Sequence, residues 1–228
     1  MCGIAGYFGE QPLTVERIQE ALGTMKRRGP DAQLFHIAST PKVSATLLHS
    51  RLSIIDLDAR SNQPFVRDGM CLVFNGEIYN YVELRKKLEE EGVELTTGGD
   101  TEVLLEYFRK YEEHCVEHFE GMWAFALFNQ KTGKLYLSRD RFGEKPLYLL
   151  RRPHGIYFAS EVKTIEAMSG EKLPVNSTHL LRYMINGHKS LYKSGEHFLE
   201  GIEEIDISTI VNVAHDLRLK EYRYWSPA

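Results

Sequence analysis

The chain has 228 residues, 43% of them hydrophobic, and a formal net charge of −4 at pH 7. A chain of this length can bury a sizeable core, and its mild negative charge excludes the basic surface that nucleic-acid binding requires. Its three cysteines lack the spacing of a disulfide framework, and no apolar run is long enough to cross a bilayer. We therefore expect a cytoplasmic globular protein with no nucleic-acid or membrane partner.

In the first part of the chain, short apolar segments bounded by turn residues predict β-strands. These segments cover residues 2–8, 43–49, 52–56 and 71–74. Thr14 is placed to cap an amphipathic helix between the first two of them. The apolar face of that helix consists of Ile18, Leu22 and Met25.

The middle of the chain contains two helix signals. Asn80 and Glu83 have the spacing of a capping box, and Gly92 would end the helix that they begin. A second amphipathic helix is expected to start near Thr101. Its apolar stripe consists of Leu104, Leu105, Phe108 and Tyr111.

The second half of the chain is rich in short strands. They are expected in the sequences GMWAFALF, GKLYLSRD and GIYFASE. A helix over residues 180–186, stopped by Gly187, and then a late extended segment are expected after them. Adjacent strands with tight turns, interrupted by paired helices, favour antiparallel sheets covered by helices, which is an α+β fold. Because no linker divides the chain, we expect one domain with a C-terminal extension.

Cys2 directly follows the initiator methionine. A free cysteine is commonly a buried strand residue, and the opening residues alone favour that interpretation. Removal of Met1, which is expected before a small second residue, would instead place the thiol beside a free α-amine with a pKa of roughly 7.7–8.0. Such an amine can take the thiol proton, so the residue would be a nucleophile with its own general base.

Three other segments place polar groups at strand or helix ends. Arg51 could bind a carboxylate through two N–H groups, although an exposed arginine at a strand edge is the commoner outcome. Asn75 and Gly76 form a tight-turn signal, and they could also offer two donors to an oxyanion. Asp100 could cap a helix or hold a substrate ammonium.

Two alternative sites are open at this point. The loop TTGGDT resembles a pyrophosphate cradle, but it lacks one residue of the Ser-Gly-Gly-x-Asp-Ser pattern, and the strands around it are not doubly wound. His114 and His118 are four residues apart and could hold zinc on one helix face. No third and fourth ligands follow at motif spacing, so a solvated helix face is the preferred interpretation.

Together, the motifs resemble the glutamine-hydrolysing domain of asparagine synthetases, a class II glutamine amidotransferase domain of the N-terminal nucleophile hydrolase type. The matching stretches follow the family's order from residue 2 to about 165: CGIAGYF, RRGPDAQ, HSRLSIIDLDARSNQPF, LVFNGEIYNYVELRKKL, GGDTEVLLEYF, FEGMWAFALFN, LYLSRDRFGEKPLYL and FASEVKTI. The resemblance implies a four-layer αββα sandwich of two antiparallel sheets flanked by helices. The nucleophile would lie at the end of the first strand.

The resemblance also implies roles for individual residues. Its catalytic set is Cys2 as the nucleophile, with the Asn75 side chain and the Gly76 N–H as the oxyanion hole. Arg51 would pair with the α-carboxylate of L-glutamine, and Asp100 with the α-ammonium. The full substrate-binding set is Arg51, Leu52, Ser53, Ile54, Ile55, Asn75, Gly76, Glu77 and Asp100. No metal ligands and no cofactor are implied for this chain.

The resemblance further implies that residues 2–190 are the amidotransferase domain. Residues 191–228 would be an extension or connector towards an ATP-dependent synthetase domain or subunit, and ATP and Mg are expected only there. That partner would use the ammonia to amidate aspartate or another carboxylate, and the chain could also pair as a homodimer. The alternative is a non-catalytic glutamine-sensing or structural module. A retained Met1 would favour it, because the α-amine would then be an amide.

Overall fold

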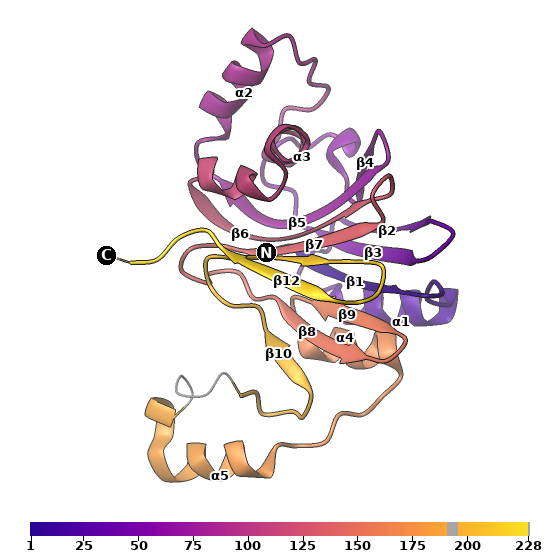
Figure 1. Ribbon diagram of the computed structural model, residues 1–228, viewed down its shortest axis with the longest axis vertical. Helices are drawn as coiled ribbons and strands as arrows, with labels where there is room; N and C mark the ends of the chain where they lie inside the picture. The colour runs from indigo at the N-terminus through magenta and orange to yellow at the C-terminus, as the bar shows by residue number, and fades with distance from the viewer. Residues whose placement is uncertain (191–195, 228) are drawn as a thin grey trace.

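The computed structural model describes residues 1–190 and 196–227. Within these residues, two six-stranded antiparallel sheets pack face to face. Helices cover the outer face of each sheet, so the molecule has four layers (Figure 1). The αββα sandwich that the sequence predicts is therefore confirmed.

The first sheet contains the N-terminal strand near its centre. Its strands, in spatial order, are β10 (Ile202–Glu204), β8 (Tyr148–Arg152), β9 (Gly155–Ala159), β1 (Gly3–Gly9), β3 (Ser44–Arg51) and β2 (Ala32–Ser39). In the register between β1 and β3, Gly3 lies opposite Ser50 and Ile4 opposite His49. The start of β1 thus lies beside the end of β3, and this places Cys2 next to Arg51.

The second sheet contains a long antiparallel pair of strands. Its strands, in spatial order, are β12 (Leu219–Arg223), β11 (Thr209–Val213), β7 (Lys134–Arg139), β6 (Gly121–Asn129), β5 (Met70–Ile78) and β4 (Phe65–Arg67). Strands β5 and β6 pair along their whole length, from Met70 opposite Asn129 to Ile78 opposite Gly121.

The outer layers consist of short helices. In Figure 1, α2 (Tyr81–Glu90) and α3 (Asp100–Tyr111) lie over β5 and β6, and α1 (Val15–Met25) and α4 (Val162–Ser169) lie over the other sheet. The Thr14 hydroxyl caps α1 as predicted, by accepting a hydrogen bond from the Arg17 N–H. The last helix, α5 (Ser177–Asn186), ends at Gly187 as expected. Short 3-10 helices cover Ala59–Ser61, Glu112–His118 and Gly187–Ser190.

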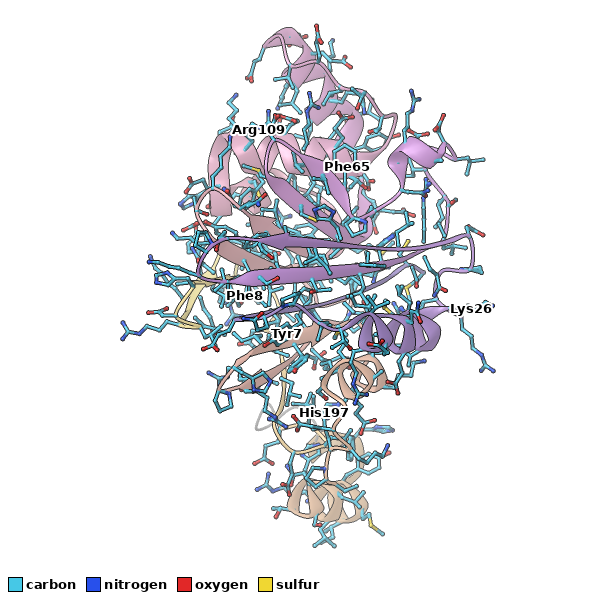
Figure 2. All side chains as sticks on the ribbon, turned by 90° about the vertical axis from the view of Figure 1, so that its right-hand side faces the viewer. Tyr7, Phe8, Lys26, Phe65, Arg109 and His197 are labelled. Atoms are coloured by element: carbon cyan, nitrogen blue, oxygen red, sulfur yellow. The ribbon has the colours of Figure 1, made fainter. Side chains whose placement is uncertain are left out.

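Side chains alternate between two cores along β1. Phe8 is fully buried between the sheets, where its ring centroid lies 5.9 Å from that of Phe128. Tyr7 faces the helix layer and packs in a cluster with Ile18 of α1 and Ile165 of α4. Figure 2 labels both β1 residues. This period-two alternation is what fixes the register of a strand buried on both faces.

Two local expectations were wrong. Residues 52–56 form a loop rather than a strand, because the chain turns after β3 and folds around the Arg51 guanidinium. The Asn80 side chain does not cap α2. Its amide instead binds the next segment of the chain, donating to His118 O at 2.9 Å and accepting from the Glu120 N–H at 3.0 Å.

The C-terminal segment is part of both sheets. Residues 191–195, the start of the expected connector, lie outside the described residues. Beyond them, β10 pairs with β8 in one sheet, and β11 lies between β7 and β12 in the other. The side chains of Ile210, Val211 and Val213 are at most 1% exposed. This segment therefore contributes to the cores of the sandwich.

Candidate active site

A pocket lies where the first residues of the chain, the end of β3, the middle of β5 and the first turn of α3 meet. Nine of the ten residues that the resemblance implies are in its wall. Its lining consists of Met1, Cys2, Arg51, Leu52, Ile54, Ile55, Ser61, Gln63, Phe65, Phe74, Asn75, Gly76, Glu77, Thr97, Gly99, Asp100, Thr101, Met122 and Lys145. Ser53 is the predicted residue outside the wall, and its N–H donates to the Asp31 carboxylate at 2.7 Å.

The Cys2 thiol is held by the first residue after β3. The Leu52 N–H donates to Cys2 Sγ at 3.3 Å, and Sγ lies 3.5 Å from Leu52 O. The guanidinium of Arg28 donates through Nε to Cys2 O at 2.9 Å. Burial raises the pKa of the thiol above its usual value. The thiol is therefore protonated at neutral pH and needs a base to become a nucleophile.

Asn75 offers a donor to the pocket, and the position after it requires a glycine. The Asn75 side chain is 1% exposed, and its Nδ2 has no hydrogen-bond partner among the described residues. A buried, unpaired donor is costly and needs an explanation, such as a ligand atom that it binds. A Cβ on Gly76 would lie 2.1 Å from Met122 O, so no other residue fits where β5 passes β6.

Asp100 is the first residue of α3, and the N-cap position is Gly99. The carboxylate is 6% exposed and points at β5, where Oδ2 accepts from the Ile78 N–H at 3.0 Å. Burial raises the pKa of Asp100 to about 6, although the Ile78 N–H favours the charged form. A cation in the pocket would stabilise this buried charge.

Arg51 is 6% exposed, so the interpretation as an exposed edge residue is wrong. Its Nη1 donates to Asp58 O at 2.9 Å and to Asn62 Oδ1 at 2.7 Å, and its Nη2 donates to Asp56 O. These bonds use three of the five N–H groups that a guanidinium carries. The others remain available for an anion in the pocket.

The loop after β3 is pinned against the loop before α3. Asp56 Oδ2 accepts from the Gly98 N–H at 2.6 Å and from the Ser61 hydroxyl at 2.7 Å. The Ser61 hydroxyl and the Gly98 N–H lower the pKa of Asp56 to about 2. Through this contact, Leu52, Ile54 and Ile55 become one wall of the pocket.

The loop TTGGDT has no free cradle for a phosphate. The N–H groups of Thr96 and Thr97 donate to the buried Glu102 carboxylate at 2.7–2.9 Å, and both hydroxyls bind it too. The Gly98 N–H donates to Asp56. The backbone donors that a pyrophosphate would need are thus already bound to the chain's own carboxylates, which argues against the nucleotide-binding alternative.

The histidine pair does not form a zinc site in the described structure. Residues 112–118 are a 3-10 helix, so a spacing of four does not place two side chains on one face. His114 Nδ1 lies 2.7 Å from a Glu117 oxygen, and His118 packs on Tyr111 with ring centroids 4.4 Å apart. Across residues 1–190 and 196–227, no group of three or more potential ligands is placed to hold a metal ion.

Sequence reasoning missed Gln63 and Lys145 as pocket residues. Lys145 is 5% exposed, and its Nζ donates to Met1 Sδ at 3.4 Å. The fully buried Asp140 shapes the turn before it, because one carboxylate accepts the N–H groups of Phe142, Glu144 and Lys145, each at 3.0 Å. The dense charges in RDRFGEKPLYL were the available signal, but they did not show which residue enters the pocket.

Two antiparallel sheets packed between layers of helices form an αββα sandwich, which is the fold of the N-terminal nucleophile hydrolases. The chain belongs to the glutamine amidotransferase domain family, whose model matches residues 1–225. Relatives of the chain include proteins named asparagine synthetase [glutamine-hydrolyzing]. None of the described helices is long and apolar enough to span a membrane.

Two relatives from Bacillus subtilis illustrate this relationship. The chain is 38% identical to asparagine synthetase [glutamine-hydrolyzing] 1, over 81% of the chain and 29% of that protein. It is 31% identical to asparagine synthetase [glutamine-hydrolyzing] 3, over 99% of the chain and 37% of that protein. The chain spans less than half the length of each of these two relatives.

Solved structures share the fold. Glutamine phosphoribosylpyrophosphate amidotransferase from B. subtilis superposes with a TM-score of 0.70 at 17% identity, over 99% of this chain and 50% of that one. A glutamine aminotransferase class-II domain protein from Silicibacter pomeroyi has a TM-score of 0.52 at 13% identity, and the match covers 100% of both chains.

Proposed function

We propose that this chain hydrolyses L-glutamine to glutamate and ammonia, with Cys2 as an N-terminal nucleophile. The observation that carries the proposal is one pocket lined by a thiol, an unpaired amide donor and a buried carboxylate. Cys2 lies just before β1, Asn75 in β5 and Asp100 at the start of α3, and the fold brings the three to one pocket.

The reaction begins with the loss of Met1, which frees the Cys2 α-amine. This amine takes the thiol proton, which the raised pKa of the thiol makes necessary, and the sulfur attacks the carboxamide carbon. The C–N bond then breaks, the proton leaves with ammonia, and a γ-glutamyl thioester remains on Cys2. Water hydrolyses the thioester and releases glutamate.

The other pocket residues match the charges of this substrate. Asn75 Nδ2 and the Gly76 N–H would bind the oxyanion of the tetrahedral intermediate, a contribution of roughly 2.7–4 kcal/mol per donor. The free N–H groups of Arg51 would bind the α-carboxylate, and Asp100 would bind the α-ammonium. With Glu77 and the wall of Leu52, Ile54 and Ile55 also lining the pocket, free amides that lack both charges would be rejected.

Met1 occupies the pocket wall beside the thiol, and its sulfur binds Lys145. Its removal would both create the general base and clear space for the substrate. Retention of Met1 would leave an amide in place of the amine, and the chain would then be an inert module of the same fold.

We further propose that the ammonia serves an ATP-dependent synthetase domain or subunit. The relatives named as asparagine synthetases are more than twice as long as the part that matches this chain, which leaves room for such a domain in them. ATP and Mg would belong to that partner. Its acceptor would be aspartate or another carboxylate, and the reaction would take place in the cytoplasm.

Intact mass and a glutaminase assay on the same sample test the proposal, with Cys2→Ala as the control. We expect a mass without methionine and glutamate release that depends on Cys2. Processed protein that releases no glutamate, alone or with a synthetase partner, would refute the proposal and favour the inert module.

A further inference from the structure

The side chain of Gln63 crosses between two parts of the pocket. It lies just before β4, is 7% exposed, and belongs to the motif SNQPF. Its Oε1 accepts from the Phe74 N–H at 2.6 Å, and its Nε2 donates to the Thr101 hydroxyl at 3.2 Å. Both hydrogen bonds are buried, so solvent cannot replace either partner.

The hydrogen bond from the Phe74 N–H to Gln63 Oε1 extends the edge of the sheet beyond the end of β4. Strand β4 pairs with β5 only from Arg67 opposite Met70 to Phe65 opposite Leu72. The next outward N–H on β5 is that of Phe74, which lies beyond the end of the pairing with β4. Gln63 Oε1 satisfies this donor, because a side-chain amide offers the same acceptor as a strand carbonyl.

The two partners of Gln63 are the chain neighbours of two proposed functional residues. Phe74 directly precedes Asn75, and Thr101 directly follows Asp100. We propose that Gln63 is a positioning residue, whose amide sets the distance between the oxyanion donor on β5 and the ammonium-binding carboxylate on α3. This inference rests on the proposed function, since it concerns the same site.

The chemistry of the bridge is directional. The Phe74 N–H on β5 requires an acceptor, which leaves the amide NH2 of Gln63 to donate to the Thr101 oxygen, so one primary amide serves both partners. Leucine has nearly the same size and meets neither. Loss of the hydrogen bond to Thr101 on α3 alone should weaken the binding of the substrate ammonium by Asp100. Loss of both hydrogen bonds should also displace Asn75.

The experiment is a double-mutant cycle of Thr101→Val and Gln63→Leu, measured as kcat and KM for L-glutamine. Thr101→Val removes the acceptor at nearly constant volume. We expect it to raise KM about fivefold, the worth of one hydrogen bond, with little change in kcat. Thr101→Ser restores the hydroxyl and should restore the wild-type KM. Gln63→Leu should lower kcat as well.

The coupling energy from this cycle distinguishes a role of Thr101 through Gln63 from a direct contact between Thr101 and the substrate. In the Gln63→Leu background, Thr101→Val should have no further effect on KM, because the bond is already absent. A matched control is Thr46→Val, which removes a buried hydroxyl that accepts from the Leu13 N–H at 3.3 Å, outside the pocket wall. It should leave KM unchanged.

Each outcome has one meaning. If Gln63→Leu fails to fold, the contrast between Thr101→Val and Thr101→Ser still decides, and equal KM values in the two variants overturn the bridge. Additive effects in the cycle overturn it too. A wild-type protein that is processed yet releases no glutamate overturns the proposed function itself, and with it the role of Gln63.

Discussion

At the scale of single residues, the pocket contains groups that are unfavourable until a substrate arrives. Asp100 is a buried carboxylate whose pKa is raised to about 6, and Asn75 carries an amide donor with no partner among the described residues. Both cost folding free energy in the empty pocket. A zwitterionic amide substrate would pair both, so their cost supports a binding role.

Asp100→Asn should make the empty protein more stable at pH 7–8. The folded state holds the Asp100 proton up to about pH 6, whereas the ordinary pKa is 3.8. Stability from this group is therefore present at low pH and lost as the pH rises from about 4 to 6, by about 3 kcal/mol for a shift of roughly two units. Urea unfolding of both proteins at pH 4.5 and 7.5 measures the difference.

The control for this prediction is Asp206→Asn, because Asp206 is exposed. It should leave the free energy of unfolding at pH 7.5 unchanged. The same Asp100→Asn variant should lose most of its affinity for L-glutamine. An Asp100→Asn variant that is less stable than wild type at pH 7.5 would show that the carboxylate supports the fold rather than the substrate.

Asn75→Leu should lower kcat by about 10²–10³-fold, which is the usual cost of losing one oxyanion donor. Because Nδ2 has no partner in the empty pocket, its replacement by an apolar group of similar size should leave the free energy of unfolding unchanged or higher. Steady-state kinetics and urea unfolding of one sample measure both. A variant that loses stability but keeps its kcat would contradict the oxyanion role.

At the scale of elements, the site depends on how the loop before α3 is held. The buried Glu102 carboxylate binds the N–H and hydroxyl groups of Thr96 and Thr97, and it pairs with Arg67 at 2.6 Å. This loop carries Thr97 and Gly99 into the pocket wall and leads directly to Asp100. One residue of α3 thus positions the loop that precedes its own helix.

Glu102→Gln should destabilise the protein by about 3 kcal/mol. Glutamine is neutral, so Arg67 loses its ion pair, and the glutamine NH2 cannot accept the hydrogen bonds that a carboxylate oxygen accepts from Thr96 and Thr97. The substitution should also raise KM for L-glutamine. Glu106→Gln, one helical turn on, is the matched control. Glu106 pairs with Arg67 at 3.3 Å and with Arg109 at 3.4 Å, but burial raises its pKa and so already disfavours its charged form, and its replacement should cost less. Equal losses in both variants, measured by urea unfolding, would contradict this account of the loop.

At the scale of the whole molecule, the sandwich is completed by its last strands. Strand β11 covers the edge of β7 and buries three aliphatic side chains, and β10 extends the other sheet at β8. Both sheets therefore depend on a segment that the sequence suggested was an extension.

Removal of residues 201–228 should prevent folding. It would uncover the edge of β7 and the apolar core beneath β11, and such an edge is prone to aggregation. Size-exclusion chromatography and circular dichroism of residues 1–200 and of the full chain measure the effect. A monomeric, cooperatively unfolding 1–200 fragment would show that the amidotransferase domain ends before these strands.

The sequence by itself determined the class of fold and nine of the nineteen residues that line the pocket. Helix caps, apolar stripes and turn signals act over a few residues, so Thr14, Gly187 and the hairpin strands could be read from local order. The residues around Cys2, Asn75 and Asp100 lie in short motifs for the same reason. Their resemblance to a known family then supplied the roles that spacing alone left open.

Only the tertiary structure decided how these pieces meet. Residues 52–56 have the apolar pattern of a strand, yet they curl because the Arg51 donors need carbonyl acceptors that a straight strand cannot bring to them. The bridge through Gln63 joins partners 11 and 38 residues away. Such contacts depend on long-range packing between buried groups. A local sequence pattern does not show which distant residue will pack against it.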